Sequence, residues 1–560
     1  HGWSVEVQIP FRTVNFNPNG QSWGINFQRI VRRKNETSYW SGWGRNQGIY
    51  SLAFAGRLEG ISDVSQGHGL DIKPYLLGNF SETPANGAPT VYRGNKGIDF
   101  AYSLTPQIKA NLTINTDFAQ TEVDDRQVNL TRFPLFFPEK RDFFLEGSGN
   151  FDFGRESAAN LTAFFTRRIG LDEVTGRPQK IDYGLKLGGR AGRTNIGLMH
   201  VRTGAENGAV GEEFTVFRPK RMFFVQSYAG LIYTRRAARE SAVPDRQTIG
   251  ADFQLATTHF RGNHNIQTSG FIMKTPNPAK PGHDSALGLR LNYPNDRWIA
   301  QMAYKFFDTN VDPAVGFIEQ QNYQKFTPGL SFNPRTKNNR YVRQIFFDSR
   351  IDLYTDAAGR WTQRTFFLTP LRVDFHSGDS VRVQVEPTYD RLENDFRLRT
   401  SPTKTITLPR DNEYQFTRYT VLATTANRRK ISGAATLTTG SFYSGTRRDV
   451  SATLNLRPRR GVFATVTSTF NRVELAEGSF STTILRGVVN TQFSPFLSVS
   501  NNIQYDSVST LLGWQTRMRW ILKPGTDLYV VWLNNWLDTE GVLTTTDRSA
   551  AMKLGYTYRF

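Results

Sequence analysis

The sequence predicts an all-β protein: a large closed antiparallel transmembrane β-barrel of about 26 strands, with 24 as the alternative count, preceded by part of a β-sandwich domain. Three observations carry this prediction. Apolar and polar residues alternate with a period of two almost to the end of the chain. Aromatic residues make up 13% of the 560 residues although the mean hydropathy is only −0.47. No apolar run approaches the roughly 18 residues that a membrane-spanning helix requires.

The alternation assigns opposite faces to the residues of single strands. In the segment 381–386 every odd position is apolar and every even position is polar. In the segment 514–522, Trp514, Met518 and Trp520 share one face, and Arg517 and Arg519 share the other. In a transmembrane barrel the apolar face meets lipid and the polar face lines the lumen. We therefore expect Arg382, Arg517 and Arg519 to be lumen-facing basic residues.

The spacing of the strands gives their number. Near the C-terminus, strands are expected to begin close to 446, 462, 478, 497, 511, 526 and 548. With longer connections elsewhere, about 490 residues at about 19 residues per strand give about 26 strands, and the even-number rule leaves 24 as the alternative. A soluble β-sandwich also alternates, but the expected strands 341–356 and 361–378 exceed the usual five or six residues. The predicted domains are residues 1–65 for the sandwich part and 66–560 for the barrel.

The last strand carries an assembly signal. Tyr556 and Tyr558 alternate with polar residues, and the chain ends on Phe560. This pattern resembles the terminal signal of bacterial outer-membrane proteins. The resemblance implies recognition by the barrel assembly machinery.

The first 65 residues follow another pattern. The stretch 3–11 reads Trp-x-x-Glu-x-x-Ile-Pro-Phe when its variable positions are left open, and the stretch 23–29 reads Trp-Gly-Ile-Asn-Phe-Gln-Arg. Together they resemble the C-terminal part of a β-sandwich of carbohydrate-binding family nine. Exposed tryptophan rings in such modules stack on sugar rings, so Trp40 and Trp43 are candidate ligand-binding residues. The alternative is that both rings pack the sandwich or its contact with the barrel.

The stretch 136–147, Phe-Phe-Pro-Glu-Lys-Arg-Asp-Phe-Phe-Leu-Glu-Gly, is the most distinctive in the chain. It resembles a large uncharacterised family of bacterial outer-membrane proteins, whose full-length members join a family-nine-like carbohydrate-binding domain to a C-terminal barrel. The resemblance spans essentially the whole chain and implies fold and location, not an activity. An inserted segment near 118–147 is one interpretation, with a plug or mouth network of Glu139, Lys140, Arg141, Asp142 and Glu146. A turn with solvated charges is the other.

The sequence lacks the usual signatures of catalysis. It has no cysteine, and no His-Glu-x-x-His, Gly-x-Ser-x-Gly or Walker motif. We therefore expect no enzymatic activity, no catalytic residue, no cofactor and no metal site. The net charge of +20 would suit nucleic acid. That partner is excluded because the basic residues alternate with apolar ones instead of forming a tract, so they suit the lumen or lipopolysaccharide phosphates.

These observations lead to one function and one alternative. The predicted function is a porin-like channel or transporter of the bacterial outer membrane, for saccharide-like or anionic solutes. The alternative is a non-transporting barrel that anchors a binding domain or belongs to an envelope complex. The expected partners are outer-membrane lipid and lipopolysaccharide, the barrel assembly machinery, carbohydrate and other envelope proteins.

Overall fold

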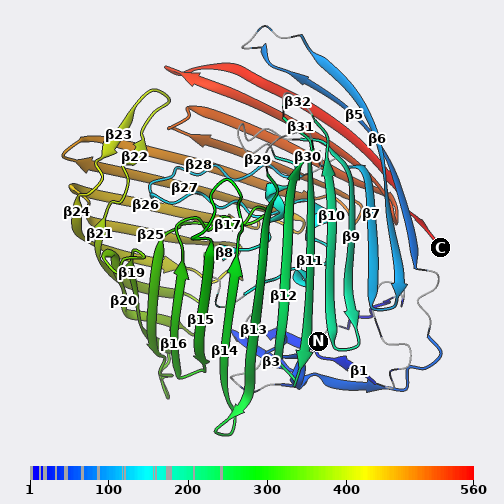
Figure 1. Cartoon of the computed structure of the whole chain (residues 1–560), viewed down its shortest axis with the longest axis horizontal. Coiled ribbons are helices and arrows are strands. Elements are labelled where there is room, and N and C mark those ends of the chain that lie inside the picture. The colour runs from blue at the N-terminus through cyan, green and yellow to red at the C-terminus, as the bar shows by residue number, and fades with distance from the viewer. Residues whose placement is uncertain are drawn as a thin grey trace.

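The computed structural model forms one closed barrel with an interior segment and a small N-terminal part (Figure 1). The structure describes residues 4–9, 11, 14, 16, 20, 22–31, 34–42, 44, 48–64, 69–84, 87, 89–116, 118, 121–154, 157, 161–171, 179–205, 209–239 and 244–560. No helix among these residues is long and apolar enough to cross a membrane.

The barrel wall is antiparallel throughout, and chain neighbours are wall neighbours almost everywhere. Its elements are β5 (Leu70–Glu82), β6 (Val91–Thr105), β7 (Ile108–Thr116), β9 (Ile181–Ala191), β10 (Thr194–Thr203), β11 (Glu212–Phe223), β12 (Ser227–Ala238), β13 (Arg246–Phe260), β14 (His264–Lys274), β15 (Ser285–Pro294), β16 (Trp298–Phe307), β18 (Tyr323–Phe332), β19 (Val342–Thr355), β20 (Trp361–Phe375), β21 (Ser380–Arg391), β24 (Glu413–Thr424), β25 (Ile431–Phe442), β26 (Gly445–Leu456), β27 (Val462–Leu475), β28 (Gly478–Gln492), β29 (Leu497–Asp506), β30 (Leu511–Lys523), β31 (Thr526–Thr539), β32 (Val542–Tyr556) and β33 (Tyr558–Arg559).

The two ends of the chain close the barrel. β32 and β33 both pair with β5, from Arg548 opposite Glu82 to Arg559 opposite Asp71, in one continuous register. The interruption between them faces Pro74 of β5, which has no N–H to donate to the ladder. β32 and β33 are therefore one strand, and the barrel has 24 strands.

The all-β barrel is confirmed, and the count of 26 is corrected to the alternative of 24. The estimate of 26 allowed for longer connections, but about 19 residues per strand left too little length for two of them. The described residues between β7 and β9 contribute no wall strand. Residues 392–412 contribute none either, because they form a separate hairpin of β22 (Phe396–Arg399) and β23 (Thr405–Leu408).

The outer face of the wall is apolar. Large exposed hydrophobic side chains recur at every second position, as in Leu287, Leu289 and Leu291 of β15. Trp514 and Trp520 of β30 belong to the same face. A closed barrel with such an exterior buries it only in lipid. The protein is an outer-membrane β-barrel.

The two ends of the barrel differ in their connections. We call the end that holds Leu70 and Phe560 the termini end, and the opposite end the loop end. The turns 106–107, 192–193 and 224–226 lie at the termini end, and the longer connections 308–322 and 392–412 lie at the loop end. Short turns face the periplasm in bacterial barrels, which makes the termini end periplasmic.

The N-terminal part lies at the termini end of the barrel (Figure 1). Its described residues form two two-stranded sheets, β1 (Ser22–Ile25) with β4 (Gly56–Glu59) and β2 (Gln28–Val31) with β3 (Glu36–Tyr39), besides the short helix η2 (Leu52–Phe54). The Phe54 ring lies 6.3 Å from that of His259 of β13. The family-nine-like carbohydrate-binding domain stays a prediction.

Candidate functional site

The described residues between β7 and β9 lie inside the barrel and contact its wall on several sides. We call 121–170 the luminal segment; it contains α1 (Asp142–Leu145), η4 (Ser148–Asn150), β8 (Leu161–Thr162) and η5 (Thr166–Arg168). β8 pairs with β17 (Phe317–Ile318), in the connection between β16 and β18. Side chains of the segment contact strands on widely separated parts of the wall, from β10 to β30. A stretch of this length reaches all of them only from inside the barrel.

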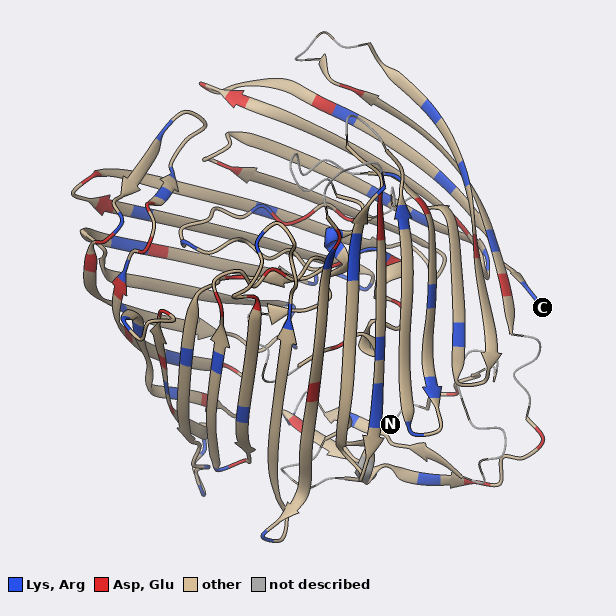
Figure 2. Cartoon of the chain, viewed as in Figure 1, with Lys and Arg blue, Asp and Glu red and all other residues tan. Residues whose placement is uncertain are grey.

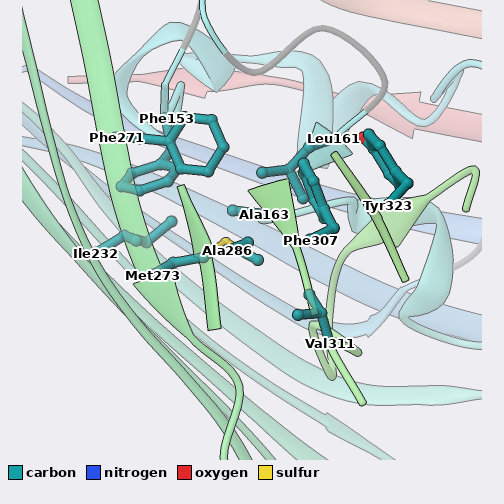
Figure 3. Close-up of a cluster of buried hydrophobic side chains, with 10 residues drawn as sticks. All are labelled: Phe153, Leu161, Ala163, Ile232, Phe271, Met273, Ala286, Phe307, Val311 and Tyr323. Atoms are coloured by element: carbon teal, nitrogen blue, oxygen red, sulfur yellow. The ribbon is translucent and has the colours of Figure 1, made fainter. Parts of the chain in front are cut away.

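One half of the luminal segment is held by apolar contacts. Phe153, Leu161 and Ala163 are buried against side chains from β12, β14, β15, β16 and β18 (Figure 3). A second cluster buries Phe144 and Phe151 against residues of β9, β10 and β11. These clusters form a core between segment and wall, which we call the apolar anchor. Burial of such aromatic side chains contributes about 1.5–3 kcal/mol each.

Two wall glycines show how closely the anchor approaches. A Cβ at Gly250 of β13 would lie 2.7 Å from the Phe153 ring, and a Cβ at Gly197 of β10 would lie 2.9 Å from the Phe151 ring. Both glycines face the lumen, where a transmembrane strand would otherwise carry a polar side chain. Inward glycines opposite an inserted phenylalanine-rich stretch are the sequence signal for this contact.

A buried ion pair secures the anchor. Arg218 of β11 and Asp252 of β13 are 2.8 Å apart, and both side chains are completely buried. Arg218 also donates to the carbonyl of Asp152, and Asp252 accepts from the backbone N–H of Gly154. The pair therefore fixes the backbone of the luminal segment on both sides of Phe153.

Asp252→Ala is expected to destabilise the barrel by about 3–5 kcal/mol, because it leaves the Arg218 guanidinium buried without its partner. Urea unfolding in lipid vesicles measures the change. The double variant Arg218→Met with Asp252→Leu removes both charges and should recover most of the loss. Equal stability of Asp252→Ala and the original protein would contradict this account.

The other half of the segment is held by polar contacts across the lumen, which we call the polar latch. Glu122 contacts Arg517 of β30 at 2.5 Å, and Asp125 contacts Arg486 of β28 at 2.8 Å. The latch has two further ion pairs: Arg126 contacts Asp506 of β29 at 3.0 Å, and Arg132 contacts Asp390 of β21 at 3.2 Å. The Glu122 and Asp125 pairs are partly exposed, and pairs of this kind stabilise by at most about 1 kcal/mol each. The Arg126 and Arg132 pairs are largely buried.

The residues predicted as a plug or mouth network lie in this segment, and most of their contacts are internal to it. Glu139 binds Arg141 at 2.7 Å, and Lys140 binds Asp124 at 3.4 Å. Only Glu146 reaches the wall, through Lys109 of β7 at 2.6 Å. Asp142 begins α1 and borders a cavity. The wall-bridging charges come instead from residues 122–132.

Both glutamates of this group are stabilised as carboxylates. Burial alone would raise the pKa of Glu139, but the hydrogen bonds and charge of Arg141 outweigh it and hold the pKa below 4.5. Burial would also raise the pKa of Glu146, but the hydrogen bond and charge of the Lys109 ammonium outweigh burial and lower this pKa. Because both pKa values are lowered, the ionised carboxylates stabilise the folded segment fully above pH 4.5, and this stabilisation is lost as the pH falls below that value.

Acidification below pH 4.5 is therefore expected to loosen residues 139–146 while the barrel strands stay protected. Hydrogen exchange of the backbone amides at pH 7 and pH 3.5 measures this difference. Glu146→Gln should show faster exchange of this stretch already at pH 7. Unchanged protection at the acid pH would contradict the assignment.

The three predicted lumen-facing arginines are placed on the inner side of the wall. Arg517 contacts Glu122 of the luminal segment, and Arg519 contacts Asp527 at 3.2 Å. Arg382 of β21 lies directly opposite Arg372 of β20. Lys and Arg are distributed over many strands and are not gathered in one tract (Figure 2).

The remaining predicted residues lie away from the lumen. The Trp40 ring packs 5.9 Å from that of Phe27, and Trp43 lies outside the described residues. The rings of Tyr556 and Tyr558 on the closing strand lie 4.3 Å apart and are tilted by 57°, and the Phe560 N–H donates to the carbonyl of Leu70 at 2.9 Å. Among the described residues, no three acidic or histidine side chains gather as a metal site would require.

A large cavity lies beside the polar latch at the termini end. Its volume is about 1050 Å³, and it lies between the luminal segment and strands β26 to β31. The positively charged residues that line it are Lys140, Arg457, Arg459, Arg460, Arg517 and Arg519, and the acidic ones are Glu122, Glu139 and Asp142. The six cations outnumber the three carboxylates.

Comparison with known proteins adds a family match and a general likeness. Residues 68–184 match a family described as a domain of unknown function, DUF5916, and this range covers β5, β6, β7 and the whole luminal segment. No curated protein matches the chain.

The barrel is similar to solved structures of receptors. A mutant of the ferric enterobactin receptor PfeA from Pseudomonas aeruginosa has 10% identity and a TM-score of 0.43 over 87% of this chain and 80% of the receptor. The siderophore receptor PirA from the same organism has 7% identity and a TM-score of 0.43, with 87% and 80% covered. The siderophore receptor PiuA from Acinetobacter baumannii has 8% identity and a TM-score of 0.37, with 87% and 82% covered.

Proposed function

We propose that the chain is a gated outer-membrane transporter for anionic solutes, with the luminal segment as its movable closure. The observation that carries the proposal is the cavity of about 1050 Å³ at the termini end, whose lining has six cations and three carboxylates. Arg459 and Arg460 are exposed there and form no ion pair with any described residue. A water-filled cavity with excess positive charge concentrates anions.

The two halves of the luminal segment suggest how it opens. Two ion pairs of the polar latch, those of Glu122 and Asp125, are partly exposed, so water can replace them at little cost. The apolar anchor is a packed core, and its exposure would cost several times more. Release of the latch with retention of the anchor would open a passage along strands β28 to β30. This asymmetry supports a gate more than a permanent filling.

The alternative, a closed barrel that anchors the N-terminal part, is favoured by one observation. The Arg218–Asp252 pair fixes the segment in a fully buried contact. An anchor has no need of an opening. Ionic currents through a variant with a weakened latch distinguish the two functions.

Arg126→Ala with Arg132→Ala is expected to produce anion-selective currents in planar bilayers, because it removes two of the four latch contacts. Added charge reversals Arg382→Glu, Arg517→Glu and Arg519→Glu should shift the reversal potential toward that of the cation. Arg472→Ala is the matched control, since Arg472 pairs with Glu474 on the outer face and is 66% exposed. If the folded latch variant carries no current, the anchor function is favoured. An unchanged reversal potential would exclude a role of these arginines in selectivity.

A further inference from the structure

We propose that a second luminal cavity, of about 420 Å³, binds a small organic anion that carries an aromatic or similarly flat apolar group. The cavity lies in the loop-end half of the barrel, on the other side of the luminal segment from the cavity described above. Its wall is formed by β15, β16, β18, β19 and β20, and Phe133 of the luminal segment covers it. The proposal names the substrate class of the transporter and rests on that proposed function.

Two buried lysines define the site. Lys305 of β16 and Lys325 of β18 lie directly opposite each other in the sheet. Their exposed fractions are 6% and 8%, so both ammonium groups are largely removed from water. Like charges directly opposite on neighbouring strands destabilise a sheet, and buried charge requires compensation. The register of β16 with β18 therefore brings two buried ammonium groups to one place on the inner face of the wall.

The carboxylates of the site do not balance its cations. Asp352 of β19 lies 2.8 Å from Lys325 and 3.3 Å from Arg350. Glu319 is the other acidic residue in the lining, and Arg290 is the fourth basic one. Four positive charges thus face two negative ones, which leaves an excess of two. A ligand with one or two negative charges, such as a phosphate or carboxylate, matches this lining.

Aromatic side chains make the rest of the cavity suitable for an organic ligand. The Arg350 guanidinium lies 4.1 Å from the centre of the Phe367 ring, and the Lys325 ammonium lies 4.6 Å from that of Tyr354. These contacts keep the cations beside flat apolar surfaces, on which a ligand ring can stack. The volume lies within the range of about 300–1,000 Å³ that is usual for small-molecule sites.

The site has an approach from the loop end. A cavity of about 870 Å³ shares Phe133 and Glu319 with it and is lined by the connections after β16, β19 and β21. A solute that enters at the loop end therefore passes this approach cavity, which Arg132 of the polar latch also lines, before it reaches the lysine pair.

Calorimetric titration of the purified full chain with phenyl phosphate tests the site. We expect saturable binding at one site, no binding of the neutral phenyl β-glucoside, and weaker binding of inorganic phosphate, which lacks the ring. Lys305→Gln should weaken the binding of phenyl phosphate by about tenfold or more, because a charge-assisted contact is lost. Arg472→Gln, on the outer face and outside both cavities, is the matched control and should bind as the original protein does.

A change in the opposite direction excludes misfolding as the cause. Asp352→Asn removes a competing carboxylate and should tighten phenyl phosphate binding, which a damaged barrel cannot do. Absence of binding, or equal affinity of Lys305→Gln and the original protein, would overturn the site. Phenyl phosphate binding without currents in the latch variant would support the site and refute transport. Currents in the latch variant without phenyl phosphate binding would support transport and refute the site.

Discussion

A chain in which a two-residue Asn-Gly turn replaces residues 117–180 is expected to form a permanently open pore, whereas the complete chain stays closed. The replacement suits the wall because Thr116 of β7 and Ile181 of β9 are directly opposite in the antiparallel pair, and Asn-Gly is the preferred two-residue hairpin turn. No wall strand is lost. Barrels of 16–18 strands already leave an aqueous channel, so 24 strands without the luminal segment should leave a wider one.

Single-channel recordings in planar bilayers measure this effect. Large, long-lived current steps are expected from the shortened chain, and only rare openings from the complete chain in the same preparation. Heat-modifiable migration on gels shows that the barrel itself is folded in both. A folded shortened barrel that does not conduct would mean that another element closes the lumen, such as the N-terminal part at the termini end. The luminal segment would then not be the gate.

The architecture of the wall was largely predictable because the membrane imposes it. Strands expected to begin near 446, 462, 478, 497, 511 and 526 begin at 445, 462, 478, 497, 511 and 526. In this region the connections are short, so alternation in one strand leads directly into the next. The last strand was placed at 548 but begins at Val542. The register shift between Asn535 and Trp536 of β31 and the threonine run 544–546 hide its alternation.

The interior was less predictable, for a physical reason. The described residues of the luminal segment have hardly any regular hydrogen-bonded structure, so no sequence period marks them. Its partners are distant along the chain: Arg132 donates to Gln363, 231 residues away, and Glu122 accepts from Arg517, 395 residues away. The residue types did indicate paired charges between phenylalanines in 136–147. They could not indicate that the wall-bridging charges lie in 122–132, since alternation assigns each wall residue to the inner face but not to a partner.

The same limit applies to the lysine pair of the second cavity. Lys305 and Lys325 were each recognisable as inward residues of an alternating strand. Their apposition follows from the register of β16 with β18, which the 15-residue connection 308–322 separates. A connection of that length fixes no register by itself. The charged sites of this barrel therefore depend on which wall strands pair in which register, and on where the luminal segment contacts the wall.

Deletion of Phe560 is expected to abolish assembly in the outer membrane while leaving synthesis intact. The residue completes the closing strand: its N–H donates to the carbonyl of Leu70 at 2.9 Å, and its side chain is 61% exposed on the outer face. Phe560→Asp should have the same effect. Cell fractionation followed by heat-modifiable migration measures the folded barrel in the membrane, and Phe496→Asp is the matched control. Phe496 lies in a turn at the same end of the barrel and is 52% exposed.

The expected loss exceeds what the contacts of Phe560 can explain through stability. One backbone hydrogen bond contributes about 0.5–1.5 kcal/mol, and a charge at the membrane interface costs about 0–1 kcal/mol. The closing strand keeps all its other pairs with β5, from Arg548 to Arg559. Purified chain without Phe560 should therefore refold from urea into detergent or lipid nearly as well as the original protein. Failure in the cell with success in the test tube assigns the residue to recognition during assembly. Failure in both would assign it to closure of the barrel, and success in both would remove any special role of the terminal aromatic residue.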